Sequence, residues 1–140
     1  MNAIDAAREM LGTPYHGGAS TPGLGCDCAG LIEYVAARVR GVAAPPRGPI
    51  TPDYYDDPAD PMLTRIRQHL QPIERCELGA VLVFRIRNRA ACSHVSICTE
   101  MKDGHPYRHI HAHSWARAHG TVESTLGPKW QARVVAMFRI

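Results

Sequence analysis

Two cysteines one residue apart, Cys26 and Cys28, precede an amphipathic run in the stretch GLGCDCAGLIEYVAARV. A Cys-x-Cys disulfide would close a small, strained ring, and the chain has five cysteines, an odd number that argues against a complete disulfide framework. Zinc sites usually space paired cysteines by two to four residues and need further ligands. Such ligands could come from Cys92, His94, His109, His111 and His113. A metal site is therefore the minor alternative, and a nucleophilic cysteine is the favoured interpretation.

Cys28 stands where the helical pattern begins, which favours it over Cys26 as the nucleophile. The first turn of a helix offers unpaired backbone N–H groups and about half a positive charge. Together with a nearby imidazolium, this position lowers the pKa of a thiol. Asp27 is placed to cap the helix or to pin the preceding loop, and small residues at Ala29 and Gly30 would admit substrate backbone over the helix start. The spacing alone does not separate this function from that of a buried structural cysteine.

The elements that must position these residues change character along the chain. Helical spacing covers residues 2–11, 28–39 and 62–70, and a proline-rich loop covers 41–61. After Gly79 the segments are short and β-branched or alternating, with a turn at the KDGHP sequence, residues 102–106. Strands are expected at 80–86, 94–101, 107–113, 120–125 and 132–140. Helices followed by a strand meander predict one α+β domain over residues 1–140, with N-terminal helices packed on a C-terminal antiparallel sheet.

Composition narrows the possible partners. The 140 residues carry a net charge of +3 with 21% charged residues, and the basic residues are scattered, so nucleic-acid binding has little support. The sequence contains no run of eighteen or more apolar residues, so it predicts no membrane-spanning helix. The N-terminal sequence has no secretory-signal pattern, so we expect the chain to be made and folded in a reducing cytoplasm.

The segment from Asp27 to Leu31, DCAGL, resembles the D-C-[S/A]-G-[L/F] signature of NlpC-type cell-wall peptidases, papain-like cysteine hydrolases of bacteria and phages. Three further segments match this family in order. They are the lead-in from Ala7 to Tyr15 with the glycine pair at 17–18, the strand LGAVLVFRI followed by SHVSI, and the HIHAH strand. The resemblance spans nearly the whole chain and is closest to the compact phage-tail branch, which includes peptidases of gene transfer agents.

The resemblance implies a papain-like fold and a set of site residues. Cys28 would be the nucleophile, His94 the general base and His111 the residue that orients His94, while Tyr15 and Asp27 would lie on the substrate and oxyanion side. His109 and His113 share a strand face with His111, so the choice among the three rests on the match of His111 to the family's His-Ala pair. Cys26 would be a buried neighbour. No metal and no cofactor would be needed.

The activity implied is that of a thiol protease that cuts an amide in the peptidoglycan stem peptide, with the bond from D-glutamate to the diamino acid favoured. The enzyme would be assembled into the tail tip or baseplate of a phage-like virion and act in the periplasm or cell wall, with the proline-rich loop as a docking surface. The alternatives are an inert structural or wall-binding tail component, an amidase or transferase using the same triad, and a cytoplasmic role in recycling muropeptides.

Overall fold

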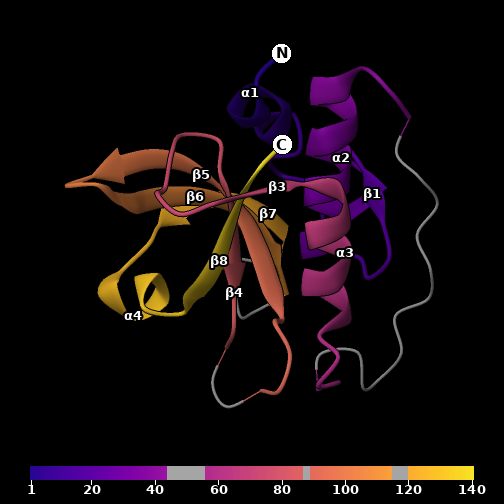
Figure 1. The fold of residues 1–140 in the computed structure, drawn as a ribbon. Helices are drawn as coiled ribbons and strands as arrows, with labels where there is room; N and C mark the ends of the chain where they lie inside the picture. Colours follow the sequence, from indigo (N-terminus) through magenta and orange to yellow (C-terminus); the bar gives the residue numbers. More distant parts are fainter. Residues whose placement is uncertain (44–55, 87–88, 115–119) are drawn as a thin grey trace.

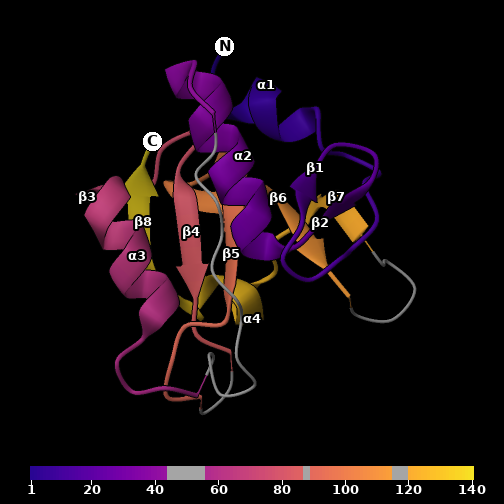
Figure 2. The ribbon, with the colours of Figure 1, turned by 90° about the vertical axis from the view of Figure 1, so that its right-hand side faces the viewer.

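A computed structural model of the protein describes residues 1–43, 56–86, 89–114 and 120–140. Its helices are α1 (Ala3–Arg8), α2 (Cys28–Arg40), α3 (Pro61–His69) and α4 (Pro128–Gln131). The strands are β1 (Ser20–Thr21), β2 (Gly25–Cys26), β3 (Gln71–Ile73), β4 (Val81–Phe84), β5 (His94–Lys102), β6 (His105–His113), β7 (Gly120–Thr125) and β8 (Val134–Arg139). Strands β3 to β8 form one antiparallel sheet in the order β3-β8-β4-β5-β6-β7, and helices α1, α2 and α3 lie along one side of it (Figures 1 and 2).

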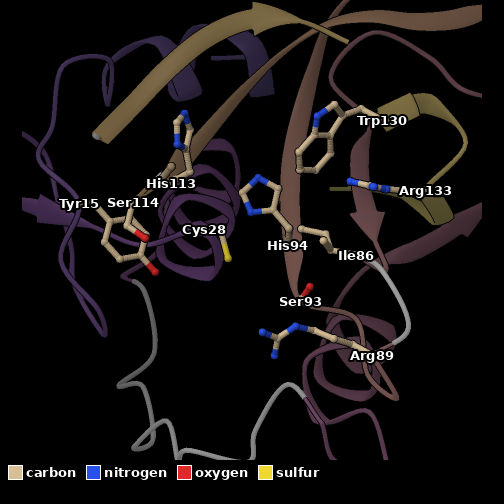
Figure 3. Close-up of a pocket in the computed structure, with 11 residues that line it drawn as sticks. Tyr15, Cys28, Ile86, Arg89, Ser93, His94, His113, Ser114, Trp130 and Arg133 are labelled. Carbon is tan, nitrogen blue, oxygen red and sulfur yellow. The ribbon is translucent and has the colours of Figure 1, made fainter. Parts of the chain in front are cut away.

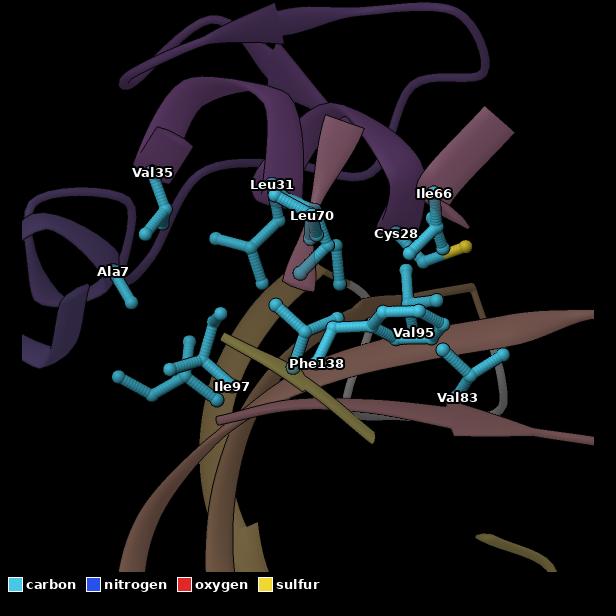
Figure 4. Close-up of a cluster of buried hydrophobic side chains, with 14 of the residues drawn as sticks. Ala7, Cys28, Leu31, Val35, Ile66, Leu70, Val83, Val95, Ile97 and Phe138 are labelled. Atoms are coloured by element: carbon cyan, nitrogen blue, oxygen red, sulfur yellow. The ribbon is translucent and has the colours of Figure 1, made fainter. Parts of the chain in front are cut away.

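The main hydrophobic core lies between these three helices and the sheet (Figure 4). Helix α2 presents Leu31 and Val35 to it, and β5 presents Val95 and Ile97, all four being fully buried. Because side chains alternate along a strand, His94 and Ser96 point to the opposite face of the sheet from Val95 and Ile97. This alternation gives β5 one face for the core and one for polar chemistry.

A second, smaller core covers the other face of the sheet. It is built around Leu82, Phe84 and Leu126, and Trp130 of α4 packs against it. The backbone N–H of Trp130 donates to the carbonyl of Gly127, which closes the short helix. Strand β4 is therefore covered on both faces, as its continuous apolar sequence VLVF requires.

The predicted α+β class, with N-terminal helices packed on an antiparallel sheet, is confirmed, and so is the β5–β6 hairpin. Several boundaries were wrong. Helix α1 ends earlier than residue 11, the last strand begins at Val134 instead of 132, and β1, β2, β3 and α4 were not foreseen. These elements have two to four residues each, too short to show a period of their own. Residues 44–55 of the proline-rich loop lie outside the described part of the chain.

Candidate active site

Cys28 is the first residue of α2 and is 3% exposed. Asp27 caps this helix: its Oδ1 accepts a hydrogen bond of 2.7 Å from the backbone N–H of Gly30. Its Oδ2 accepts another, also of 2.7 Å, from the N–H of Gly18. Asp27 therefore does both things expected of it, since it caps the helix and pins the glycine-rich loop. Its carboxylate is 1% exposed and held by backbone amides, so its contribution to the site is to fix the helix start.

Gly30 is small for a different reason from the predicted one, which was to admit substrate backbone over the helix start. A Cβ at Gly30 would lie 2.1 Å from the carbonyl oxygen of Ala19. The Ser20 hydroxyl also donates to the Gly30 carbonyl at 2.6 Å. The protein's own loop, and not substrate backbone, therefore occupies the space beside Gly30. The close approach locks this loop against the helix that carries Cys28.

His94 opens β5 and is linked to β6 through its ring. Its Nε2 lies 2.8 Å from Nδ1 of His111, and Nε2 of His111 lies 3.1 Å from the hydroxyl of Ser124 on β7. An antiparallel register places these three side chains on neighbouring strands. These two hydrogen bonds have the same direction when Nε2–H of His94 donates to His111 and Nε2–H of His111 donates to Ser124. In that tautomer Nδ1 of His94 carries the lone pair and can accept a proton.

The histidines of β6 form a row of neighbouring rings, of which His111 contacts His94. The rings of His109 and His111 stack with centroids 4.1 Å apart, and those of His111 and His113 are 4.5 Å apart. The shared strand face predicted for these three residues is confirmed. His109 bonds through Nδ1 to the hydroxyl of Ser96 at 2.8 Å, so it pairs with a neighbour other than His94.

Burial holds these imidazoles in their uncharged form. It lowers the pKa of His94 from 6.5 to about 3, with the neighbouring imidazoles of His109 and His113 acting in the same direction. Burial also lowers the pKa of His109 to about 4, and the pKa of His111 falls well below its usual range. The imidazolium invoked from sequence next to Cys28 is therefore disfavoured in the resting site. His94 is a neutral base that becomes charged only as it takes a proton.

A cavity of about 540 Å³ opens beside Cys28 and His94 (Figure 3). Its described lining residues are Tyr15, Cys28, Ile86, Arg89, Ser93, His94, Ala112, His113, Ser114, Trp130 and Arg133. The side chains of Cys28 and His94 lie next to each other at its centre, with Tyr15 and His113 on the cysteine side and Trp130 and Arg133 on the histidine side (Figure 3).

The structure thus brings together Cys28, His94, His111 and Tyr15 from four separate segments of the sequence. Tyr15 is held by an isolated bridge to Cys26. Sequence reasoning missed Ser124, Trp130 and the cavity arginines, because their placement depends on strand register and on a helix of one turn. A serine in an alternating strand opposite a histidine strand is the only local signal for Ser124.

Cys26 is fully buried, and its Sγ lies 3.1 Å from the carbonyl oxygen of Asp27. Its thiol packs in the main core, as expected of a buried neighbour. Among the residues that the structure describes, no group of three or more histidine, cysteine, aspartate or glutamate side chains is arranged to hold a metal ion. Within the same residues, no helix is long and apolar enough to cross a bilayer.

No protein-family model matches the chain, but solved structures share its architecture. One is a lipoprotein-like protein of the NLP/P60 family from Staphylococcus aureus, with a TM-score of 0.64 and 22% identity over 98% of this chain and 39% of that one. Another is the NlpC/p60 domain of the peptidoglycan hydrolase SagA, with a TM-score of 0.63 and 18% identity over 99% of this chain and 96% of that domain. The chain has the NlpC/P60 fold.

Part of this NlpC/P60-fold chain is also similar in sequence to a known hydrolase. The gamma-DL-glutamyl hydrolase of Bacillus subtilis is 40% identical to it over 42 residues, which are 30% of this chain and 10% of the relative. The similarity thus covers a short segment of a much longer protein. The fold predicted from the DCAGL signature is confirmed by the two structures.

Proposed function

We propose that the protein is a cysteine peptidase that hydrolyses an amide of the peptidoglycan stem peptide. The observation that carries the proposal is the arrangement at the centre of the cavity. Cys28 at the start of α2 lies beside His94 (Figure 3), whose Nε2 is fixed by His111 at 2.8 Å. This is the geometry that a thiol nucleophile, a general base and an orienting group require.

In the proposed reaction, Nδ1 of His94 takes the proton of the Cys28 thiol while the sulfur attacks the amide carbon. The carbonyl oxygen becomes an oxyanion, for which the backbone N–H of Cys28 and the Tyr15 hydroxyl are the proposed donors. The imidazolium of His94 then protonates the leaving amine, and the C–N bond breaks to give a thioester on Cys28. Water, deprotonated by His94, hydrolyses this thioester and restores the thiol.

The depressed pKa of His94 fits general-base catalysis better than a preformed ion pair. A base with a pKa of about 3 is uncharged at every pH near neutrality. The developing thiolate offsets the cost of charging it, because opposite charges a few ångströms apart attract strongly in a buried site. His111 contributes by accepting a hydrogen bond from the Nε2–H of His94, which keeps the lone pair of His94 on Nδ1.

The names of the relatives and the family resemblance support the proposed substrate class. SagA is named a peptidoglycan hydrolase and the Bacillus subtilis relative a gamma-DL-glutamyl hydrolase. The first name fits a peptidoglycan substrate, and the second fits the bond that the family resemblance favours, which joins D-glutamate to the diamino acid. No metal or organic cofactor has a part in the proposed mechanism, since the thiol supplies the nucleophile.

The proposal extends to delivery by a phage-like tail. The resemblance to tail-borne peptidases of phages and gene transfer agents supports a protein held at the tail tip or baseplate, which opens the wall locally for DNA delivery. Its partners would be other tail proteins, and its site of action the periplasm or cell wall. Proteomics of purified particles tests this part: low-copy incorporation supports it, whereas particles that are fully infective without the protein contradict it.

The activity itself is tested on purified sacculi with matched cysteine variants. Wild-type protein and Cys26→Ala should release soluble fragments, and Cys28→Ala should release none while keeping its circular dichroism spectrum. Mass spectrometry of the fragments distinguishes an endopeptidase from an amidase or transferase. An inactive wild-type protein that still binds sacculi would instead support the inert tail component.

A further inference from the structure

The wall of the cavity has an uneven charge distribution that the proposed mechanism does not use. Among the described lining residues are Arg89 and Arg133, and none of them is an aspartate or glutamate. In Figure 3, Arg133 lies beside Trp130 on the histidine side of the Cys28–His94 pair, and Arg89 lies below the pair, on the side away from His113. A partly enclosed site with positive charge on one side selects a substrate group of negative charge.

Arg133 is held in place by an aromatic ring. Its guanidinium carbon lies 5.3 Å from the centre of the Trp130 ring. Trp130 in turn meets Phe84 edge to face at 5.7 Å and lies 6.2 Å from the His94 ring. Stacking leaves the edge of a guanidinium available for two parallel hydrogen bonds to a carboxylate. The Trp130 ring therefore holds the charge of Arg133 on the histidine side of the cavity before any substrate arrives.

Arg89 comes from the segment between β4 and β5 and is among the residues that line the cavity (Figure 3). It pairs with Asp56 at 3.4 Å, and the two side chains are 46% and 60% exposed. Exposed ion pairs of this kind contribute little to stability. Exchange of the Asp56 carboxylate for one from a ligand would cost little, so Arg89 can serve as a second contact.

His94 fixes which part of the substrate these arginines meet. Its imidazolium must deliver a proton to the leaving amine, so groups packed on the histidine side of the cavity face the leaving-group residue. Trp130 and Arg133 are on that side, whereas Tyr15 is across Cys28.

We propose that Arg89 and Arg133 form a subsite for a carboxylate carried by the residue on the amine side of the bond that is cut. This inference rests on the proposed hydrolase function and specifies its substrate: an anionic leaving-group residue, in which the carboxylate is free and not amidated. Arg133 is the fixed contact and Arg89 the exchangeable one.

The test uses synthetic γ-glutamyl peptides in two matched pairs. One pair differs only in whether the leaving-group residue carries a carboxylate or a carboxamide, and the other pair differs in the same way on the acyl side. For the wild type, kcat/KM should favour the leaving-group carboxylate by about tenfold or more, because hydrogen bonds to charged groups are worth this much. Arg133→Gln should remove most of that preference, chiefly by raising KM, and Arg89→Gln should reduce it.

Arg38→Gln is the matched control. Arg38 is 45% exposed and paired with Glu9, and ten residues of helix place it about 15 Å from Cys28. This variant loses the same charge and should keep the full preference. Equal rates on the acid and the amide, or a preference unchanged in Arg133→Gln, would overturn the proposal.

Direct binding separates a failed subsite from a failed hydrolase. If the wild type cuts none of the peptides, calorimetry of Cys28→Ala with the acid and amide peptides still measures the subsite. Tighter binding of the leaving-group carboxylate, lost with Arg133→Gln, supports the proposal. Equal binding of both peptides, or none, overturns it.

Discussion

Lowering the pH should destabilise the fold through its buried histidines well before its carboxylates protonate. The pKa of His94 in the folded protein is about 3 and that of His109 about 4, against 6.5 for an ordinary histidine. As the pH falls below 6.5, the unfolded chain binds protons that the folded protein does not, so the free energy of unfolding decreases. The loss continues until the pH reaches the folded pKa values.

The size of the effect follows from the same pKa values. Between pH 7 and 5, each histidine with a strongly lowered pKa costs about 2 kcal/mol of stability. His94 and His109 together give about 4 kcal/mol, and His111, whose pKa is also lowered, raises the total to about 6 kcal/mol. That is a large share of the stability of an ordinary domain, about 5–15 kcal/mol. The carboxyls of Glu9 and Glu77, whose pKa values lie below 4.5, titrate outside this window.

Urea denaturation at pH 7, 6 and 5 measures this loss. His109→Gln removes one buried imidazole outside the proposed triad. The free energy of unfolding of this variant should therefore decrease less steeply with falling pH than that of the wild type, with slopes that differ by up to about 1.4 kcal/mol per pH unit. His69→Gln, at an exposed position on α3, controls for the substitution itself. Equal stability of the wild type at pH 7 and pH 5, or histidine pKa values near 6.5 by NMR, would show that burial does not keep these histidines uncharged.

Three further predictions concern the site. Gly30→Ala should destabilise the protein by several kcal/mol and abolish activity, because its Cβ would meet the Ala19 carbonyl at 2.1 Å; a wild-type melting temperature would contradict this close approach. Because the pKa of His94 is about 3, kcat/KM should stay flat from pH 7 down to pH 5 while the protein remains folded, whereas a fall centred near 6.5 would mean a solvated base. Ser124→Ala should lower kcat about tenfold or less with KM unchanged, since it removes one hydrogen bond to His111, and a loss as large as that of His111→Ala would place Ser124 in the chemistry itself.

The sequence predicts much of this site because its signals are local. Cys28 follows a capping aspartate and opens an amphipathic helix, so its position is visible in a few residues. The alternation of histidines at 109, 111 and 113 likewise predicts a shared strand face, which the ring stacking confirms.

The parts that could not be predicted depend on contacts between distant segments. The link from His94 to His111 and on to Ser124 is set by the register of three strands. The reason for a glycine at position 30 is the close approach of the Ala19 carbonyl, which belongs to a loop eleven residues earlier in the chain. The lowered pKa of His94 comes from burial, and the position of Arg133 from a one-turn helix that carries Trp130.

Alkylation of the wild type with iodoacetamide at pH 6, followed by peptide mapping, measures whether Cys28 is the activated thiol of this protein. If Cys28 is a nucleophile activated by His94, Cys28 should be modified first among the five cysteines, and His94→Ala should slow that modification at least about tenfold. Faster modification of Cys26 or Cys76, or a Cys28 rate that does not depend on His94, would mean that Cys28 is not a nucleophile activated by His94.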